Sequence, residues 1–399
     1  MTIRRQFKQF RESRSMAYFL MLCLFLLSSM VVADQSTKLK KSKAFEQSEQ
    51  QANQLFSKAV SSPTVPGISV AVGNQSGIIW AQGFGFSNLE NNVPMTAKTK
   101  LRVGSVAKVI TAAGLMRIDQ KKPVDFDAPI IDFVKQWPSS HPKISLRQLT
   151  NHTSGIRHYR GEEFLSNKEY PTRVAALEIF KDDPLQFTPG SRFSYSTYAW
   201  TLVSAAMEAH DRGRNFKQII RQEVFQPLEM NDSTFDDASP IISNRHTPYS
   251  YRDGKLINSP SVNSSYKYAG GGFLSTPSDI VKMAVAHTKT DFLPADSLNQ
   301  MTKPTAKENG SNFGIGWLVG WDSYLNRLNR EKTKNKKYLE MIARHENAVM
   351  HSGGSMGGVT MLILCLDHNH SAAVAKNVSG ESSANVFNLA LETLDLFAK

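Results

Sequence analysis

Gly104-Ser105-Val106-Ala107-Lys108 is the stretch of this 399-residue sequence that decides how the chain is interpreted. It lies between a predicted β-hairpin and an apolar helical run over residues 109–116. Residues three apart share one face of a helix, so the Ser105 hydroxyl is expected beside the Lys108 amine. A lysine that is desolvated near a helix N-terminus favours its neutral form and can activate a serine as a nucleophile. The spacing therefore predicts a serine nucleophile with a lysine base.

The spacing alone leaves a structural alternative open, in which the serine caps a helix and the lysine is a solvated charge. The same S-x-x-K spacing occurs at two other places, Ser140/Lys143 and Ser264/Lys267. The rest of the chain must therefore decide between a catalytic and a structural interpretation.

Strand-like runs occur at both ends of the chain. They cover residues 67–72, 78–85, 348–353, 359–366 and 372–378. Apolar residues at helical spacing predict amphipathic helices near both termini, over 45–60 and 384–396. We therefore predict an α/β fold, in which an antiparallel five-stranded sheet built from both chain ends is flanked by the terminal helices. Prolines punctuate a large, mainly helical insertion between the two halves of the sheet.

The N-terminal residues have the pattern of an export signal. Basic residues precede an apolar run over 17–33, which ends on small residues and is short for a membrane span. We expect cleavage after Ala33, a polar spacer over 34–43 and a single domain over 44–399. The α/β part of that domain is expected to cover 44–104 and 345–399, and the mainly helical part 105–344. The predicted location is the periplasm or outside the cell, with transient membrane contact only through the signal.

Two further segments fit the Ser105 site. The loop over 189–197 precedes a predicted helix and could present the Tyr195 phenol to a pocket. His351-Ser352-Gly353-Gly354 ends a predicted strand, where small residues let a substrate backbone approach closely. A serine, a lysine, a tyrosine and a strand edge together supply the groups that acyl transfer requires.

These segments resemble the serine β-lactamase-like family, which includes class C β-lactamases, D,D-peptidases and related esterases. The resemblance covers about residues 60–395, and its motifs occur in the family's order: Ser105-Val106-Ala107-Lys108, Tyr195-Ser196-Thr197 and His351-Ser352-Gly353. Each motif alone is weak, but the ordered set is specific. The likeness is greatest to the mitochondrial serine β-lactamase-like proteins and their bacterial relatives, through residues 154–159 and 263–272.

The resemblance implies a role for each matching residue. Ser105 would form an acyl-enzyme, while Lys108 and Tyr195 would share proton transfer as a coupled pair. The backbone N–H groups of Ser105 and Gly354 would stabilise the oxyanion. The other residues of the second and third motifs would bind substrate, namely Thr197, His351, Ser352 and Gly353.

Two departures from the family pattern weaken the case for a dedicated β-lactamase. Thr197 stands where lactamases and many peptidases have an asparagine that grips the substrate's acylamido group. His351, largely neutral at pH 7, stands where efficient lactamases have a lysine for the substrate carboxylate. The expected function is an exported serine hydrolase of peptidase or esterase type. The alternatives are a D,D-carboxypeptidase, a weak β-lactamase or a catalytically silent binding module.

Other motifs favour structural interpretations. The G-x-S-x-G match at residues 353–357 is followed by a predicted strand, where a nucleophile elbow requires a helix. His368 and His370 are expected in a turn and not in a metal site. His152 is expected to hold a loop. The segment 157–159 could line the pocket mouth or form a surface loop.

The remaining expectations concern partners and stability. We expect no cofactor and no metal, a small-molecule or peptide substrate and no nucleic-acid partner, while the oligomeric state stays open. Cys23 lies in the predicted signal and Cys365 in a predicted strand, so the mature chain cannot form an internal disulfide. The basic segment 326–337 is expected to be a solvated loop.

Overall fold

The structure is a computed structural model that describes residues 42–330 and 335–398. The chain divides into two compact units, Met1–Gln47 and Ser48–Lys399, and the elements of the candidate site all lie in the second. The predicted export signal over 1–33 and most of the predicted spacer lie outside the described residues. Among the described residues, no helix is both long enough and apolar enough to cross a membrane.

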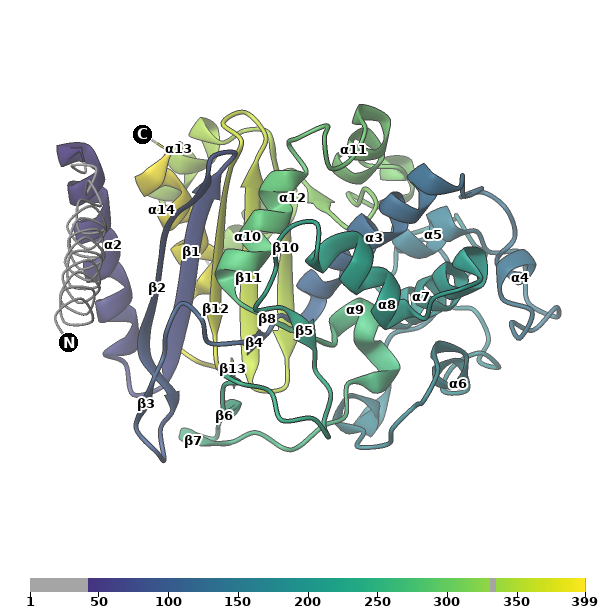
Figure 1. Cartoon of the computed structure of the whole chain (residues 1–399), viewed down its shortest axis with the longest axis horizontal. Coiled ribbons are helices and arrows are strands. Elements are labelled where there is room, and N and C mark those ends of the chain that lie inside the picture. Colours follow the sequence, from purple (N-terminus) through teal and green to yellow (C-terminus); the bar gives the residue numbers. More distant parts are fainter. Residues whose placement is uncertain (1–41, 331–334, 399) are drawn as a thin grey trace, which may run out of the picture. The chain divides into compact units, whose positions relative to one another are not determined.

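A seven-stranded sheet forms the centre of the second unit (Figure 1). Its strands, in spatial order, are β3 (Val93–Pro94), β2 (Gly77–Asn88), β1 (Gly67–Asn74), β12 (His370–Lys376), β11 (Gly358–Cys365), β10 (Ala348–Ser355) and β9 (Leu318–Val319). All neighbouring strands are antiparallel. The two halves of the sheet join where β1 pairs with β12, from Ile68 opposite Lys376 to Asn74 opposite His370.

This topology confirms the predicted sheet in all but one respect. The five predicted strands are β1, β2, β10, β11 and β12, and they are drawn from both ends of the chain. The expected number of five strands is wrong, because β3 and β9 extend the two edges of the sheet. Each of these strands has two residues, too few to show the alternation that identifies a strand in a sequence.

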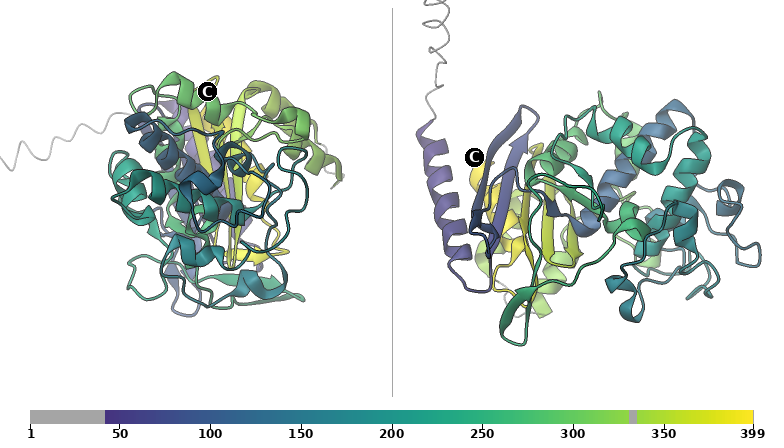
Figure 2. Two further views of the ribbon diagram at one scale, coloured as in Figure 1. Left: turned by 90° about the vertical axis from the view of Figure 1, so that its right-hand side faces the viewer. Right: turned by 60° about the horizontal axis from the view of Figure 1, so that its bottom comes forward.

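The terminal helices cover one face of the sheet through aromatic side chains. Phe56 of α2 (Lys43–Val60) stacks on Phe84 of β2 with ring centroids 5.3 Å apart. Phe397 of α14 (Val386–Phe397) stacks on Trp80 of the same strand at 5.4 Å. Helix α10 (Pro277–Ala286) packs on β1 and β12 from the other side, where the helical region begins (Figure 1; Figure 2, right). The predicted flanking helices are therefore confirmed.

The middle of the chain is mainly helical, as predicted, with short strands between the helices. Its other helices are α3 (Ala107–Lys121), α4 (Ile130–Phe133), α5 (Leu146–Thr150), α6 (Arg173–Leu177), α7 (Thr197–Asp211), α8 (Phe216–Ile220), α9 (Tyr268–Gly271) and α11 (Ala295–Thr302). Short helical turns are η1 (Gly104–Val106), η2 (Gly161–Leu165), η3 (Arg221–Phe225), η4 (Ser265–Lys267) and η5 (Lys307–Asn309). One small sheet contains, in spatial order, β4 (Leu101–Arg102), β8 (Phe273–Ser275) and β5 (Thr234–Phe235). A second small sheet contains β13 (Val378–Gly380), β6 (Tyr249–Arg252) and β7 (Lys255–Asn258).

The prediction of a solvated loop over 326–337 is wrong for the part that the structure describes. Helices α12 (Asp322–Arg330) and α13 (Lys336–Arg344) occupy most of this region. Tyr324 and Leu328, one helical turn apart, are 2% and 1% exposed, and Met341 is 8% exposed. A narrow apolar stripe thus anchors each helix, although charged residues dominate the composition.

Candidate active site

The predicted nucleophile lies at the start of α3. Ser105 sits in the turn η1 and is partly exposed, whereas Lys108, on the first turn of α3, is completely buried. The Lys108 Nζ atom lies 3.2 Å from the Ser105 Oγ atom. The structure therefore brings the predicted serine and lysine into contact.

Lys108 is held by two further oxygen atoms. Its amine donates to the Gly270 carbonyl at 2.7 Å and to the Thr197 hydroxyl at 3.2 Å. Burial lowers the pKa of Lys108 well below its usual value of 10.5, and the charge of Lys267 lowers it further. The environment thus favours the neutral amine. A neutral amine has two hydrogens, which Gly270 and Thr197 can accept, and one lone pair, which remains available to the Ser105 hydroxyl proton.

Tyr195 completes the group around Ser105. A hydrogen bond links its phenol to the Ser105 side chain, and the Lys108 Nζ atom lies 4.8 Å from the centre of its ring. Burial raises the pKa of Tyr195 above its usual value, so the phenol stays protonated at neutral pH. Ser105 therefore has a group suited to accept a proton and a group suited to donate one.

Thr197 supports the amine and is hardly accessible. It begins α7, where Ser196 caps the helix by accepting from the Ala199 backbone N–H at 3.1 Å. Thr197 is 2% exposed, and its hydroxyl contacts Lys108 and hydrogen-bonds to Tyr159. The sequence predicted that Thr197 would bind substrate, but these contacts suit the positioning of Lys108.

The third motif lies on β10 beside the nucleophile turn. A Cβ atom built on Gly353 would lie 1.9 Å from the Val103 carbonyl oxygen, and one on Gly104 would lie 2.8 Å from the Gly354 backbone nitrogen. The two backbones therefore touch, and only glycine permits the contact. Gly354 itself is exposed, with no atom within 4 Å of the position of a Cβ. This geometry places the Gly354 backbone nitrogen beside the Ser105 turn, next to open space.

His351 and Ser352 interact with each other. The His351 Nδ1–H donates to the Ser352 carbonyl at 2.7 Å, and the His351 Nε2 atom has no hydrogen-bond partner among the described residues. Burial lowers the pKa of His351 to about 3, and the Lys108 charge contributes. His351 is therefore neutral at physiological pH and supplies no cation at this end of β10.

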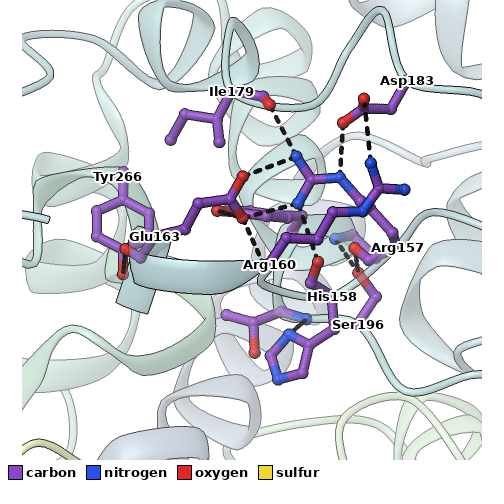
Figure 3. A network of polar contacts seen from close by, with 11 residues as sticks. Arg157, His158, Arg160, Glu163, Ile179, Asp183, Ser196 and Tyr266 are labelled. Carbon is purple, nitrogen blue, oxygen red and sulfur yellow. Dashed lines mark hydrogen bonds and ion pairs between the residues drawn. The ribbon is translucent and has the colours of Figure 1, made fainter. Parts of the chain in front are cut away.

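An ion-pair network centred on the buried Arg157 fixes the loop that precedes η2 (Figure 3). The Arg157 side chain is 5% exposed and donates hydrogen bonds to Glu163 at 2.7 and 2.9 Å and to Asp183 at 2.6 Å. The backbone carbonyl of Arg157 accepts a hydrogen bond from Ser196 Oγ at 2.7 Å. The adjacent His158 accepts the Thr197 backbone N–H at its Nδ1 atom at 3.3 Å. Arg157 is therefore not part of a surface loop, whereas His158 and Tyr159 are half-buried. Arg157 and His158 orient the start of α7.

His152 has the structural role that the sequence predicted. Its Nδ1 atom accepts from the Ser196 backbone N–H at 3.1 Å, and its ring centre lies 4.3 Å from that of Tyr195. His152 is fully buried, which lowers its pKa well below the usual value. It therefore holds the Tyr195 loop as a neutral side chain.

Comparison with known proteins agrees with this geometry. A family model described as Beta-lactamase matches residues 52–394. The chain belongs to the beta-lactamase family. Its curated relatives include the mitochondrial serine beta-lactamase-like protein of Homo sapiens, which is 28% identical over 75% of this chain and 68% of its own length. Together with the Ser105–Lys108 contact, family membership makes the protein a serine hydrolase.

Solved structures share the fold. EstCE1, described as a hydrolase with promiscuous acyltransferase activity, has a TM-score of 0.72 and 18% identity over 89% of this chain and all of its own. A D-amino acid amidase from Ochrobactrum anthropi, complexed with L-phenylalanine amide, has a TM-score of 0.71 and 21% identity over 88% of this chain and 98% of its own. At these identities the likeness shows the fold, which is the predicted one.

Within this beta-lactamase family member, the structure separates the three S-x-x-K pairs. Ser140 and Lys143 are both exposed. Ser264 donates its hydroxyl to Asp236 at 2.9 Å, while the Lys267 side chain contacts aromatic rings instead. Only Ser105 and Lys108, among these three described pairs, join a hydroxyl to an amine.

Lys267 is a residue whose importance the sequence did not reveal. It is 3% exposed, and its Nζ atom lies 4.3 Å from the centre of the Phe164 ring. Burial lowers the pKa of Lys267 from 10.5 to about 8, and Arg102 contributes. The sequence marked it only as the lysine of the Ser264/Lys267 spacing, and its burial can be recognised only in the structure.

We expect Lys267→Met to stabilise the protein at neutral pH. The folded-state pKa is lowered, so the cost of burying the charge is fully present below pH 8 and disappears as pH rises towards 10.5. Allowing for the lost aromatic contacts, the free energy of unfolding should rise by about 1–3 kcal/mol at pH 7. Urea unfolding of both proteins at pH 7 and pH 10 measures this, and a gain as large at pH 10 would contradict it.

One cluster distant from Ser105 has the composition of a metal site. Ligand atoms of His345, Cys365 and His368 lie within 4.8 Å of one another. The Cys365 Sγ atom is 3.4 Å from His345 Nδ1 and 3.3 Å from His368 Nδ1. The predicted turn is present at His368, which lies between β11 and β12, but His370 is the first residue of β12. The sequence could not show that His345 approaches this turn. Cys365 pairs with Ala348 at the opposite end of β10 from Gly353, so the cluster is separate from the site.

Proposed function

We propose that the protein hydrolyses ester and amide bonds through an acyl-enzyme on Ser105. The observation that carries this proposal is the fully buried Lys108 amine, 3.2 Å from the Ser105 Oγ atom. A buried amine with a lowered pKa can accept a proton at neutral pH, which a solvated lysine does poorly.

The proposed acylation step moves one proton and exchanges one bond. The Ser105 hydroxyl proton passes to the Lys108 Nζ atom as Ser105 Oγ bonds to the substrate carbonyl carbon. The oxyanion that forms accepts hydrogen bonds from the backbone N–H groups of Ser105 and Gly354. Lys108 and Tyr195, acting as a coupled pair, return the proton to the leaving oxygen or nitrogen as its bond to carbon breaks. Water then releases the acyl group by the reverse sequence.

The third motif favours simple esters and amides over penicillins. His351 is buried and neutral, so it supplies no fixed cation for the carboxylate of a penicillin. The activities of two proteins with the same fold, EstCE1 as a hydrolase with promiscuous acyltransferase activity and the D-amino acid amidase, support substrates of these two classes.

Export is a separate part of the proposal. The basic and apolar pattern of residues 1–33 supports secretion to the periplasm or beyond, where cell-wall peptides would be accessible. Cell fractionation of the full chain, with N-terminal sequencing of the mature protein, tests cleavage after Ala33.

A substrate panel tests the proposed reaction. We expect kcat/KM for p-nitrophenyl butyrate to exceed that for benzylpenicillin by about 10- to 100-fold, since the loss of a charged contact to substrate is typically worth that much. The kcat/KM values for a D-Ala-D-Ala peptide and for D-phenylalanine amide show which of the peptide and amide alternatives is preferred. Mass spectrometry of the quenched ester reaction should show the acyl group on the peptide that contains Ser105. Comparable turnover of the penicillin and the ester would contradict the proposal.

A further inference from the structure

Lys267 is a buried cation without an ion-pair partner. Across residues 42–330 and 335–398, no carboxylate forms an ion pair with it. Three aromatic rings surround its Nζ atom, with centroids at 4.3 Å for Phe164, 5.3 Å for Tyr266 and 5.8 Å for Tyr159. Aromatic faces attract a cation but do not replace a counter-ion, so a buried ammonium held in this way remains poorly compensated.

The carboxylate whose charge acts on Lys267 is already neutralised by other residues. The negative charge of Asp236 acts on Lys267, but its Oδ2 atom accepts from Arg102 at 2.8 Å and from Ser264 at 2.9 Å. Its Oδ1 atom is ion-paired with Arg245. Two guanidinium groups therefore share this carboxylate, and the region around Lys267 has an excess of positive charge.

Lys267 borders the candidate active site. It ends η4, directly before α9, and its Cδ atom would lie 4.0 Å from a Cβ built on Gly271. The same Cβ position lies 4.0 Å from the carbonyl oxygen of Gly104, the residue before the nucleophile. The charge of Lys267 also acts on Lys108 and His158. The absence of a side chain at Gly271 thus leaves space between Lys267 and the Ser105 turn.

We propose that Lys267 binds a carboxylate group of the substrate, so that the enzyme prefers acidic esters and amides over neutral ones. This inference rests on the proposed hydrolysis at Ser105. A substrate carboxylate would supply the counter-ion that the described residues do not, and a charge-assisted hydrogen bond in a desolvated site is strong. Such a group approaches from η4 and α9, and not from β10, where His351 is neutral. The site therefore recognises a carboxylate at a place other than the third motif.

The first test compares two substrates that differ by one charge, mono-p-nitrophenyl adipate and its methyl ester. Wild type should have the higher kcat/KM for the acid. In Lys267→Met, which keeps the length of the side chain, the ratio of acid to methyl ester should fall about 10- to 100-fold. Lys267→Arg should retain most of the preference, and Lys143→Met, with the same charge change on an exposed residue, should leave it intact. A purely structural role for Lys267 would lower both rates equally.

A second test needs no turnover. Titration calorimetry of Ser105→Ala with glutarate and with glutaramide measures whether the protein binds the dianion more tightly, and Ser105→Ala/Lys267→Met should lose the difference. If esters are hydrolysed but neither preference appears, the Lys267 inference is overturned and the hydrolase remains. If turnover is absent from wild type, the proposed function fails, and the glutarate titration still decides whether Lys267 binds carboxylates.

Discussion

Ser105→Ala is expected to lower kcat for p-nitrophenyl butyrate by at least about 10⁴-fold and to abolish labelling by a fluorophosphonate probe. The substitution removes only the hydroxyl group, whose oxygen contacts the Lys108 amine and the Tyr195 phenol. Without it, the amine and the phenol have no nucleophile to activate. Because Ser105 is partly exposed in a short turn, the substitution should leave the thermal stability almost unchanged.

Ser140→Ala is the matched control for this experiment. Ser140 also precedes a lysine by three residues, but both side chains are exposed and they make no contact with each other among the described interactions. Labelling and turnover should be those of wild type. Equal labelling of wild type and Ser105→Ala would remove Ser105 from the mechanism, and with it the assignment of Lys108 and Tyr195.

The fold could be predicted to the extent that its elements have regular patterns. Strands β1 and β12 are apolar over nearly their whole length, and the turn signals around them are strong, so both were identifiable. The sequence predicted one sheet built from both chain ends, but the pairing of β1 with β12 is known only from the structure. Edge strands β3 and β9 have two residues each, and helices α12 and α13 bury narrow stripes within charged sequences. Tertiary packing determines such elements more than local pattern does.

In the candidate site too, contacts between residues close in sequence could be predicted, and contacts between distant residues could not. Ser105 and Lys108 are one helical turn apart, so a local rule was enough to pair them. The partners of the Lys108 amine were not predictable, because the Gly270 carbonyl lies 162 residues away in sequence and has no distinguishing side chain. Lys267 could only be recognised from its burial beside neutralised Asp236. Roles that depend on burial and on contacts with residues distant in sequence can therefore be assigned only from the structure.

Lys108→Met and Lys108→Arg together test whether the buried amine acts as a base. Methionine keeps the length of the side chain but has no proton acceptor of comparable strength, so kcat for p-nitrophenyl butyrate should fall about 10³-fold, the usual contribution of a general base. Arginine keeps the positive charge but cannot lose its proton at any accessible pH. If Lys108 works as a neutral amine, the arginine variant should be as inactive as the methionine variant. If it works only as a cation, arginine should restore activity.

The pH dependence of the wild type provides the internal check on this argument. Burial lowers the pKa of Lys108 well below 10.5, so the fraction of neutral amine, and with it kcat/KM, should reach a plateau before pH 10. A rate that still rises in proportion to hydroxide near pH 10 would mean that the amine titrates like a solvated lysine.

Urea unfolding of Lys108→Met and Lys108→Arg shows whether each variant is folded under the assay conditions. A folded Lys108→Met variant that retains activity within about tenfold of wild type would exclude the amine as the base, because no other described group with a lowered pKa contacts Ser105 Oγ.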